Sequence, residues 1–101
     1  MIEKMMTLQE AYKIVITNEP TMKAINWEEH DEFYMFNLVP RDLAKGEGFA
    51  NSCVYTVWKD HSKQGWMYGP DMMKYWPPIR MSDDVSALEE FYKMYRRNNK
   101  S

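Results

Sequence analysis

The residue types that could perform chemistry in this 101-residue chain are a single cysteine and two histidines. On paper, Cys53 could act as a nucleophile. The base and the orienting carboxylate would then come from His30, His61 and Asp60. However, Cys53 opens an apolar stretch with no glycine-rich turn beside it, and a cysteine in such a setting behaves mostly as a small buried hydrophobe. We therefore expect no catalytic residues and no enzymatic activity.

Residues 28–32 combine four carboxylates with the imidazole of His30, and both ligand types suit a divalent metal. The run lacks the glycine-containing spacing of a calcium loop, and no second histidine is near it. Charge runs of this kind are usually solvated. Gly46 and Gly48 are followed by no Gly-Lys-Ser/Thr, so they do not predict a phosphate cradle. We expect a solvated turn at residues 28–32, with no metal and no cofactor.

Charge and composition argue against nucleic acid and membrane as partners. Thirteen Lys and Arg against fifteen Asp and Glu give a net charge of -2, which is not the basic excess that displaces counterions from a phosphate backbone. Residues 93–100 interleave cations with Tyr95 and could contact RNA, but the end of a helix also favours cations. No window of ~18 apolar residues exists, and the N-terminus has no signal-peptide pattern.

Length and composition indicate one small domain covering residues 1–101. Hydrophobic residues make up 45% of the chain and charged residues 28%, close to the globular average. The mean hydropathy of -0.68 is low, because that index scores tryptophan and tyrosine as polar although both have large apolar bodies. A single cysteine cannot form an internal disulfide, which fits a reducing compartment. We expect a soluble cytoplasmic protein.

The first element that would position a site is a helix beginning after Thr7. Thr7 and Glu10 have the spacing of a capping box, in which each side chain bonds the other's backbone amide. An apolar stripe follows at helical spacing, formed by Leu8, Ala11, Tyr12, Val15 and Ile16. Pro20 ends the helix, because it pushes the preceding residue out of the α region.

The middle of the chain favours strands. Residues 22–27 alternate weakly and could form an edge strand, although the sequence leaves open whether they join the sheet. Residues 33–39 are rich in β formers and apolar toward both faces, which predicts a central strand covered on each side. Residues 41–51 indicate a loop. Residues 53–58 and 66–68 predict a hairpin with its turn at residues 59–65.

A final helix is predicted after Ser82, which would act as its cap, with Asp83 and Asp84 in the first turn. Its buried stripe would consist of Val85, Leu88, Phe91, Tyr92 and Tyr95. The predicted fold class is therefore α+β: an N-terminal helix, a three- to four-stranded antiparallel sheet and a C-terminal helix packed on the sheet.

An excess of apolar residues between positions 66 and 81 is the strongest functional signal. Aromatic residues and methionine are enriched at the centres of protein interfaces, and flexible methionines adapt to varied partners. Two interpretations stay open: the segment folds back to complete the core, or it binds a partner. Under the second, the predicted partner-binding residues are Trp66, Tyr68, Met72, Met73, Tyr75 and Trp76, with the two tryptophans as anchors.

The patterns at residues 7–13, 20–24, 36–40 and 57–60 resemble a group of small uncharacterised Firmicute proteins, some carried on mobile elements. The resemblance covers about residues 6–68. The helix followed by a hairpin is also similar to PepSY-like and bacterial immunity-type domains, which implies binding or inhibition of another protein without catalysis. The hairpin turn after Lys59 and Asp60 is longer than the tight Thr-Gly turn of those domains. PepSY proteins often have an export signal, and we expect none here. No site residue carries over from the family.

Two classes of function follow from the sequence. The first is a cytoplasmic, non-catalytic module for protein–protein interaction, which binds a partner protein or itself as a homodimer. The alternative is a small-ligand-binding domain with an aromatic pocket between the sheet and residues 46–51. A ligand would stabilise the fold by mass action, whereas an interaction module would respond to no small molecule.

Overall fold

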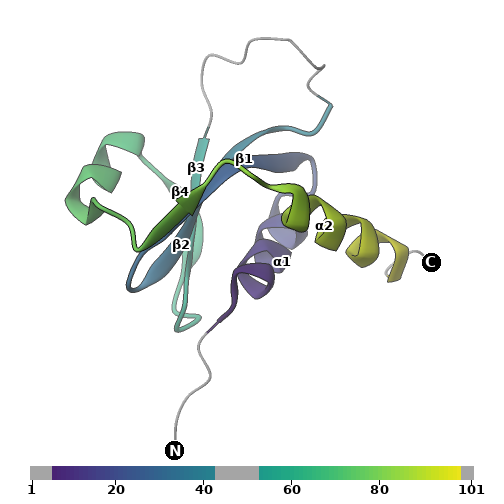
Figure 1. The fold of residues 1–101 in the computed structure, drawn as a ribbon, viewed down its shortest axis with the longest axis horizontal. Coiled ribbons are helices and arrows are strands. Elements are labelled where there is room, and N and C mark those ends of the chain that lie inside the picture. The colour runs from purple at the N-terminus through teal and green to yellow at the C-terminus, as the bar shows by residue number, and fades with distance from the viewer. Residues whose placement is uncertain (1–5, 43–52, 99–101) are drawn as a thin grey trace, which may run out of the picture.

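The computed structural model describes residues 6–42 and 53–98. They form helix α1 (Leu8–Asn18), strands β1 (Met22–Glu29), β2 (Phe33–Pro40), β3 (Cys53–Trp58) and β4 (Gln64–Met67), the 3-10 helix η1 (Gly69–Tyr75), strand β5 (Arg80–Ser82) and helix α2 (Ser86–Asn98). The strands pair antiparallel in one sheet with the order β4-β3-β2-β1-β5. Figure 1 shows both helices on one side of this sheet and η1 on the other.

The predicted α+β fold is confirmed, with five strands in place of three or four. The additional strand is β5, whose three residues pair with β1. Residues 22–27, whose place was open, belong to β1 and join the sheet beside β2. Only Trp27, Glu28 and Glu29 also pair with β5, so among the described residues the first part of β1 lies at the edge of the sheet. A register shift between Ala24 and Asn26 leaves Ile25 41% exposed. Most of the loop predicted at residues 41–51 lies outside the described residues.

Helix α1 begins where the sequence predicts, at a capping box formed by Thr7 and Glu10. The Thr7 hydroxyl accepts from the Glu10 amide at 3.1 Å, and the Glu10 carboxylate accepts from the Thr7 amide at 2.8 Å. These bonds satisfy amides that the first helical turn leaves without a partner. The predicted stripe packs inward, with Ala11, Tyr12 and Val15 fully buried. The helix ends at Asn18, two residues before Pro20.

Strand β2 is the centre of the fold, because it is buried toward both faces as its apolar run predicts. Tyr34, Phe36 and Leu38 face the helices and belong to the main core cluster. The residues between them face the other side of the sheet, since side chains alternate along a strand. On that side Phe33 and Met35 are also buried. The sheet therefore needs a cover on the face that α1 and α2 leave open.

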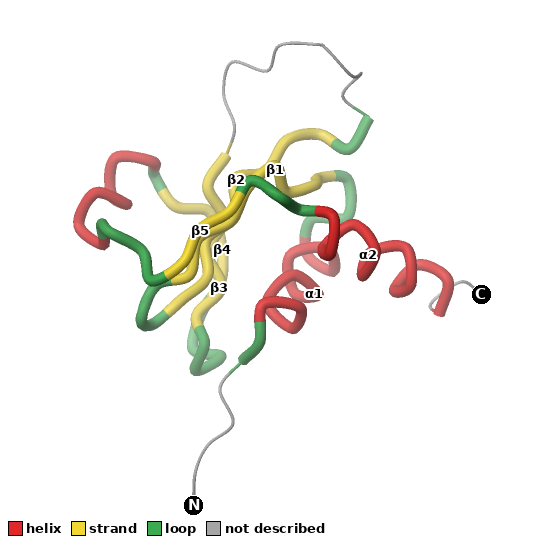
Figure 2. The backbone as a smooth tube through the Cα atoms, viewed as in Figure 1, coloured by secondary structure: helices red, strands yellow, loops and turns green. Residues whose placement is uncertain are grey.

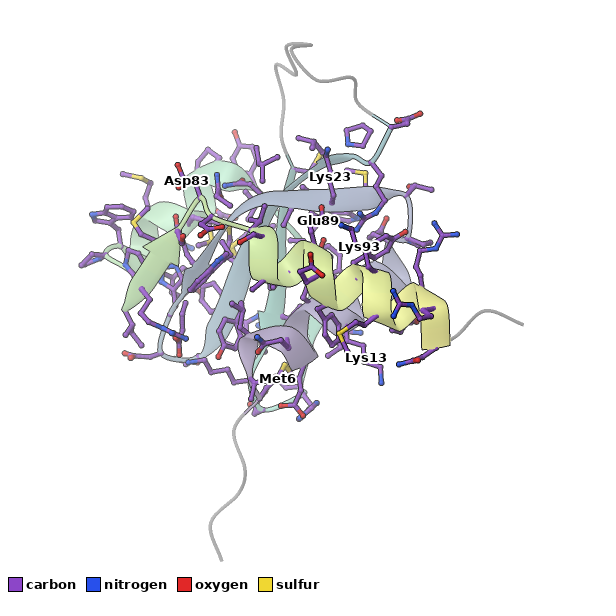
Figure 3. All side chains as sticks on the ribbon, turned by 45° about the vertical axis from the view of Figure 1, so that its right-hand side comes forward. Met6, Lys13, Lys23, Asp83, Glu89 and Lys93 are labelled. Carbon is purple, nitrogen blue, oxygen red and sulfur yellow. The ribbon has the colours of Figure 1, made fainter. Side chains whose placement is uncertain are left out.

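Helix α2 starts later than predicted. Ser82 belongs to β5 and pairs with Trp27, so it is not the cap of the helix. Asp84 caps the start of the helix instead, because its carboxylate accepts from both the amide and the hydroxyl of Ser86, at 3.1 and 2.7 Å. The predicted stripe is confirmed: Leu88 is buried and the other four residues pack against the core. Figure 3 shows Asp83 before the helix and Glu89 and Lys93 along it.

Candidate functional site

Residues 68–79 connect β4 at one edge of the sheet to β5 at the other edge, and we call this segment the crossover. It contains η1 and passes the face of the sheet that lies opposite the two helices (Figure 2). Short stretches of irregular chain carry many backbone groups that need partners. The crossover therefore has to be anchored to the sheet at a few points.

Tyr75 is the main anchor of the crossover. Its ring meets the ring of Phe33 edge-on, with 4.9 Å between centroids. Its carbonyl oxygen lies 3.0 Å from Nδ1 of His30, and the Ile79 amide donates to the carbonyl of Glu29 at 2.7 Å. These contacts fix the crossover against the turn between β1 and β2.

His30 makes this contact with Tyr75, and no pattern in the sequence indicates that role. Its ring is 4% exposed, stacks on Phe33 at 4.8 Å, and places Nε2 2.8 Å from a carboxylate oxygen of Glu28. The ring therefore makes one contact with the crossover and one with β1. The prediction of a solvated turn is correct for Asp31 and Glu32, which are exposed, and wrong for the buried His30 and for Glu28 and Glu29, which lie half-buried in β1.

The crossover covers part of the sheet, yet its own apolar side chains stay largely outside. Met73 is 76% exposed, Trp76 59% and Ile79 57%, and Met81 on β5 is 57% exposed. We call these four residues the crossover surface. The two interpretations of the apolar excess therefore each describe a part of it. Tyr75, 36% exposed, packs on Phe33 and Met72 is half-buried, while the crossover surface faces solvent.

The six residues predicted to bind a partner fall into two groups. Met72, Met73, Tyr75 and Trp76 lie on the crossover. Trp66, 49% exposed, lies on β4, where its ring meets Tyr55 edge-on at 5.0 Å, and Tyr68, 72% exposed, follows the strand as the first residue of the crossover. Ile79 and Met81 were not among the six, although their alternation after Pro78 places both on the same side of the chain.

A hollow of about 260 Å³ lies between the crossover and the β1–β2 turn. Trp76 and Ile79 contribute its apolar wall, and the charged residues lining it are Asp31, Glu32 and Lys74. Because two carboxylates and one ammonium group line the hollow, these three side chains have a net negative charge. The surface therefore combines an apolar centre with an acidic border.

A charged cluster lies on the helix side of the sheet, next to the start of α1. Glu29 accepts from Lys59 and from Arg80, each at 2.7 Å, and Lys59 is 8% exposed. Burial opposes ionisation of Glu29, but the hydrogen bonds from Lys59 and Arg80 hold its pKa below the usual value. Burial also raises the pKa of Tyr34 beside it. The cations are paired by Glu29, which makes the cluster a structural support.

The structure does not assemble the nucleophilic site that the residue types allow. Cys53 pairs with Leu38 at one end of β3, whereas Phe33, next to His30 on the ring stack, pairs with Trp58 at the other end. Five residues of strand separate these pairs, about 17 Å at the usual rise. Cys53 is exposed, contrary to expectation. Among residues 6–42 and 53–98, no three His, Cys, Asp or Glu residues form a group that could hold a metal ion.

Comparison with protein-family models, with curated proteins and with solved structures gave no match to this chain. In the described parts of the chain, no helix has both the length and the apolar character that crossing a bilayer requires. The main functional feature of the described residues is an anchored segment with large exposed apolar side chains.

Proposed function

We propose that this protein is a non-catalytic interaction module that binds a partner protein through the crossover surface. The observation that carries the proposal is the exposure of Met73, Trp76 and Ile79 on the crossover, whose backbone is anchored at Tyr75, and of Met81 on the adjoining strand β5. Large exposed apolar side chains concentrated in one part of a small domain are typical of interaction sites. The inhibitory or immunity-type role implied by the sequence resemblance stays a prediction.

Anchoring matters for affinity, because ordering a loop on binding costs free energy. The hydrogen bond from His30 to Tyr75 and the ring contact with Phe33 already hold the crossover in place. A preorganised surface loses less entropy when a partner docks. Trp76 is the expected anchor, since tryptophan is enriched among the residues that dominate binding energies.

The charges around the crossover surface indicate the chemistry of the partner. Asp31 and Glu32 border the hollow beside Trp76, opposed by Lys74 alone among its lining residues. Complementary charges at the rim of an interface steer association and select partners. The partner is therefore a protein that offers an apolar patch bordered by lysine or arginine. The small-ligand alternative stays a prediction, because the loop at residues 46–51 that would form its wall lies outside the described residues.

The test compares variants of the full chain as immobilised bait in a lysate of the native source. Trp76→Ser combined with Met73→Ser removes the apolar centre, and Met94→Ser, at an exposed methionine of α2, serves as the matched control. A protein retained by the wild type and the control, and lost from the double variant, is then purified and titrated. We expect at least a tenfold loss of affinity for the double variant, and a smaller loss for Asp31→Asn with Glu32→Gln.

Equal retention of every protein by the wild type and the double variant would contradict the proposal. So would a partner whose affinity falls with Met94→Ser and not with the double variant, since that result would place the interface on the helices.

A further inference from the structure

Strand β4 forms one edge of the sheet, and within residues 6–42 and 53–98 no strand pairs with its outer side. Trp58 donates to the carbonyl of Lys63 at 3.0 Å, which closes the β3–β4 hairpin with a hydrogen-bonded pair. Such pairs alternate along an antiparallel ladder. Gly65 and Met67 therefore bond inward to β3, while Gln64 and Trp66 direct their amides and carbonyls away from the sheet. The register thus identifies an edge ready to receive another strand.

The space beside this edge is shaped by Gly65. A hollow of about 320 Å³ lies there, lined by Trp58 and Met67 among others. A Cβ placed on Gly65 would meet no atom within 4 Å. The φ of Gly65 is 152°, a backbone conformation that L side chains rarely adopt, so the strand itself favours glycine here and leaves the space open. A side chain from an added strand, directly opposite Gly65, would fill this space on the face away from the helices.

We infer that the occupant of this edge is β4 of a second copy of the same chain, paired antiparallel about a two-fold axis. In such a pair the outward backbone groups of Gln64 and Trp66 must lie opposite the outward backbone groups of the second copy. Three registers with two-fold symmetry meet this condition. They place Lys63, Gly65 or Met67 of the second copy opposite Gly65. Only the last puts an apolar side chain over the hollow.

The selected register brings the two Trp66 residues together at the two-fold axis. It pairs Gln64 of each copy with Tyr68 of the other, and Tyr68 has the extended backbone that this requires (φ -66°, ψ 125°). The Tyr68 carbonyl already accepts from the Asp71 amide at 2.9 Å, so it would accept the Gln64 amide with its second lone pair. The exposed Trp66 and Tyr68 side chains are then covered on binding. A net charge of -2 per chain opposes the association only weakly.

This edge is separate from the crossover surface, so the dimer and the proposed function can fail independently. The probe is the full chain itself, studied by sedimentation equilibrium from about 5 to 500 µM, a range suited to the weak affinity of small interfaces. The mean mass is expected to rise from 12.2 kDa toward twice that value. A mass that stays monomeric over the whole range overturns the inference.

Gln64→Pro tests the strand pairing, because proline removes an outward amide and no bond to β3. Symmetry makes this a loss of two hydrogen bonds per dimer, and we expect dimerisation to weaken at least tenfold. Gln64→Thr keeps the amide and is expected to dimerise like the wild type. Unchanged dimerisation of Gln64→Pro contradicts the pairing.

A separate pair of substitutions tests which residues of the two copies lie opposite each other. Met67→Ser is expected to weaken the dimer several-fold, while Met73→Ser on the crossover leaves it unchanged. If Gln64→Pro does not fold, amide exchange in the wild type decides: the Gln64 and Trp66 amides gain protection as concentration rises, whereas the Met67 amide is protected throughout. Equal behaviour of these amides at all concentrations overturns the inference.

Discussion

Nδ1 of His30 lies 3.0 Å from the carbonyl oxygen of Tyr75, and this contact joins the β1–β2 turn to a segment 45 residues further along the chain. It holds the crossover where the Tyr75 ring can pack on Phe33. The neighbouring Trp76 is then left 59% exposed. The division of the crossover into an anchored part and an exposed part thus depends on one buried histidine.

Replacing His30 tests this dependence. His30→Ala removes a buried ring and leaves the Tyr75 carbonyl without its partner, so the free energy of unfolding is expected to fall by about 2–4 kcal/mol. Urea denaturation measures the loss, and hydrogen exchange should quicken in the crossover more than in β2. The exposed His61 gives the control: His61→Asn is expected to change stability by less than about 0.5 kcal/mol. Equal effects at both positions would contradict the anchoring role.

Phe33 and Trp76 provide a contrast between a core aromatic and an exposed one. Phe33 is fully buried, with its ring 4.9 Å from both Trp58 and Tyr75. Phe33→Ala is expected to cost about 3–5 kcal/mol of stability, whereas Trp76→Ala is expected to cost less than about 1 kcal/mol. Thermal or urea unfolding checks both. A large loss for Trp76→Ala would mean that its side chain completes the core.

The charged cluster predicts a dependence of stability on pH. The pKa of Glu29 is lowered in the folded protein, so its contribution to stability is present above its unfolded-state pKa and is lost as pH falls through the folded-state pKa. That loss lies in the acid range, below the usual glutamate value of 4.5. Urea midpoints measured from pH 7 to about pH 3 should fall less steeply for Glu29→Gln than for the wild type. Parallel curves would show that Glu29 has no part in the acid loss.

Arg41 predicts a difference between arginine and lysine. Its guanidinium lies 3.3 Å from the centre of the Tyr92 ring, and its two terminal nitrogens each donate at 3.2 Å, one to Glu89 and one to the Tyr12 hydroxyl. Lysine cannot reproduce this planar, forked geometry. Arg41→Lys is expected to lower the free energy of unfolding by about 1–2 kcal/mol.

Arg96 is the matched control, since it is exposed and its guanidinium lies 5.9 Å from the same ring. Arg96→Lys is expected to leave the denaturation midpoint nearly unchanged. Similar losses at the two positions would count against the specific role of Arg41.

The elements that sequence predicts well are those fixed by local chemistry. The Thr7–Glu10 capping box and the stripe of α1 depend on residues within a few positions of one another, and β2 is apolar enough to require burial on both faces. The start of α2 was misplaced because Ser82, a good cap by type, is used by a strand pair with Trp27. That pair joins residues far apart in sequence, which a local pattern does not reveal.

The sequence marks residues 66–81 as rich in apolar side chains but does not indicate which of them are exposed. Met72 and Met73 are identical in type and adjacent, yet one is half-buried and the other is 76% exposed. Composition therefore locates an apolar surface between residues 66 and 81, whereas the tertiary contacts decide which side chains form it.

Peroxide oxidation of methionines, read by mass spectrometry, tests directly whether a partner protein binds the crossover surface. It is measured with and without the protein retained by the bait. Met73 and Met94 are 76% and 56% exposed, so both should oxidise in the free protein. With the partner bound, we expect Met73 to be protected several-fold and Met94 to react as before. Protection of Met94 with continued oxidation of Met73 would contradict binding at the crossover surface.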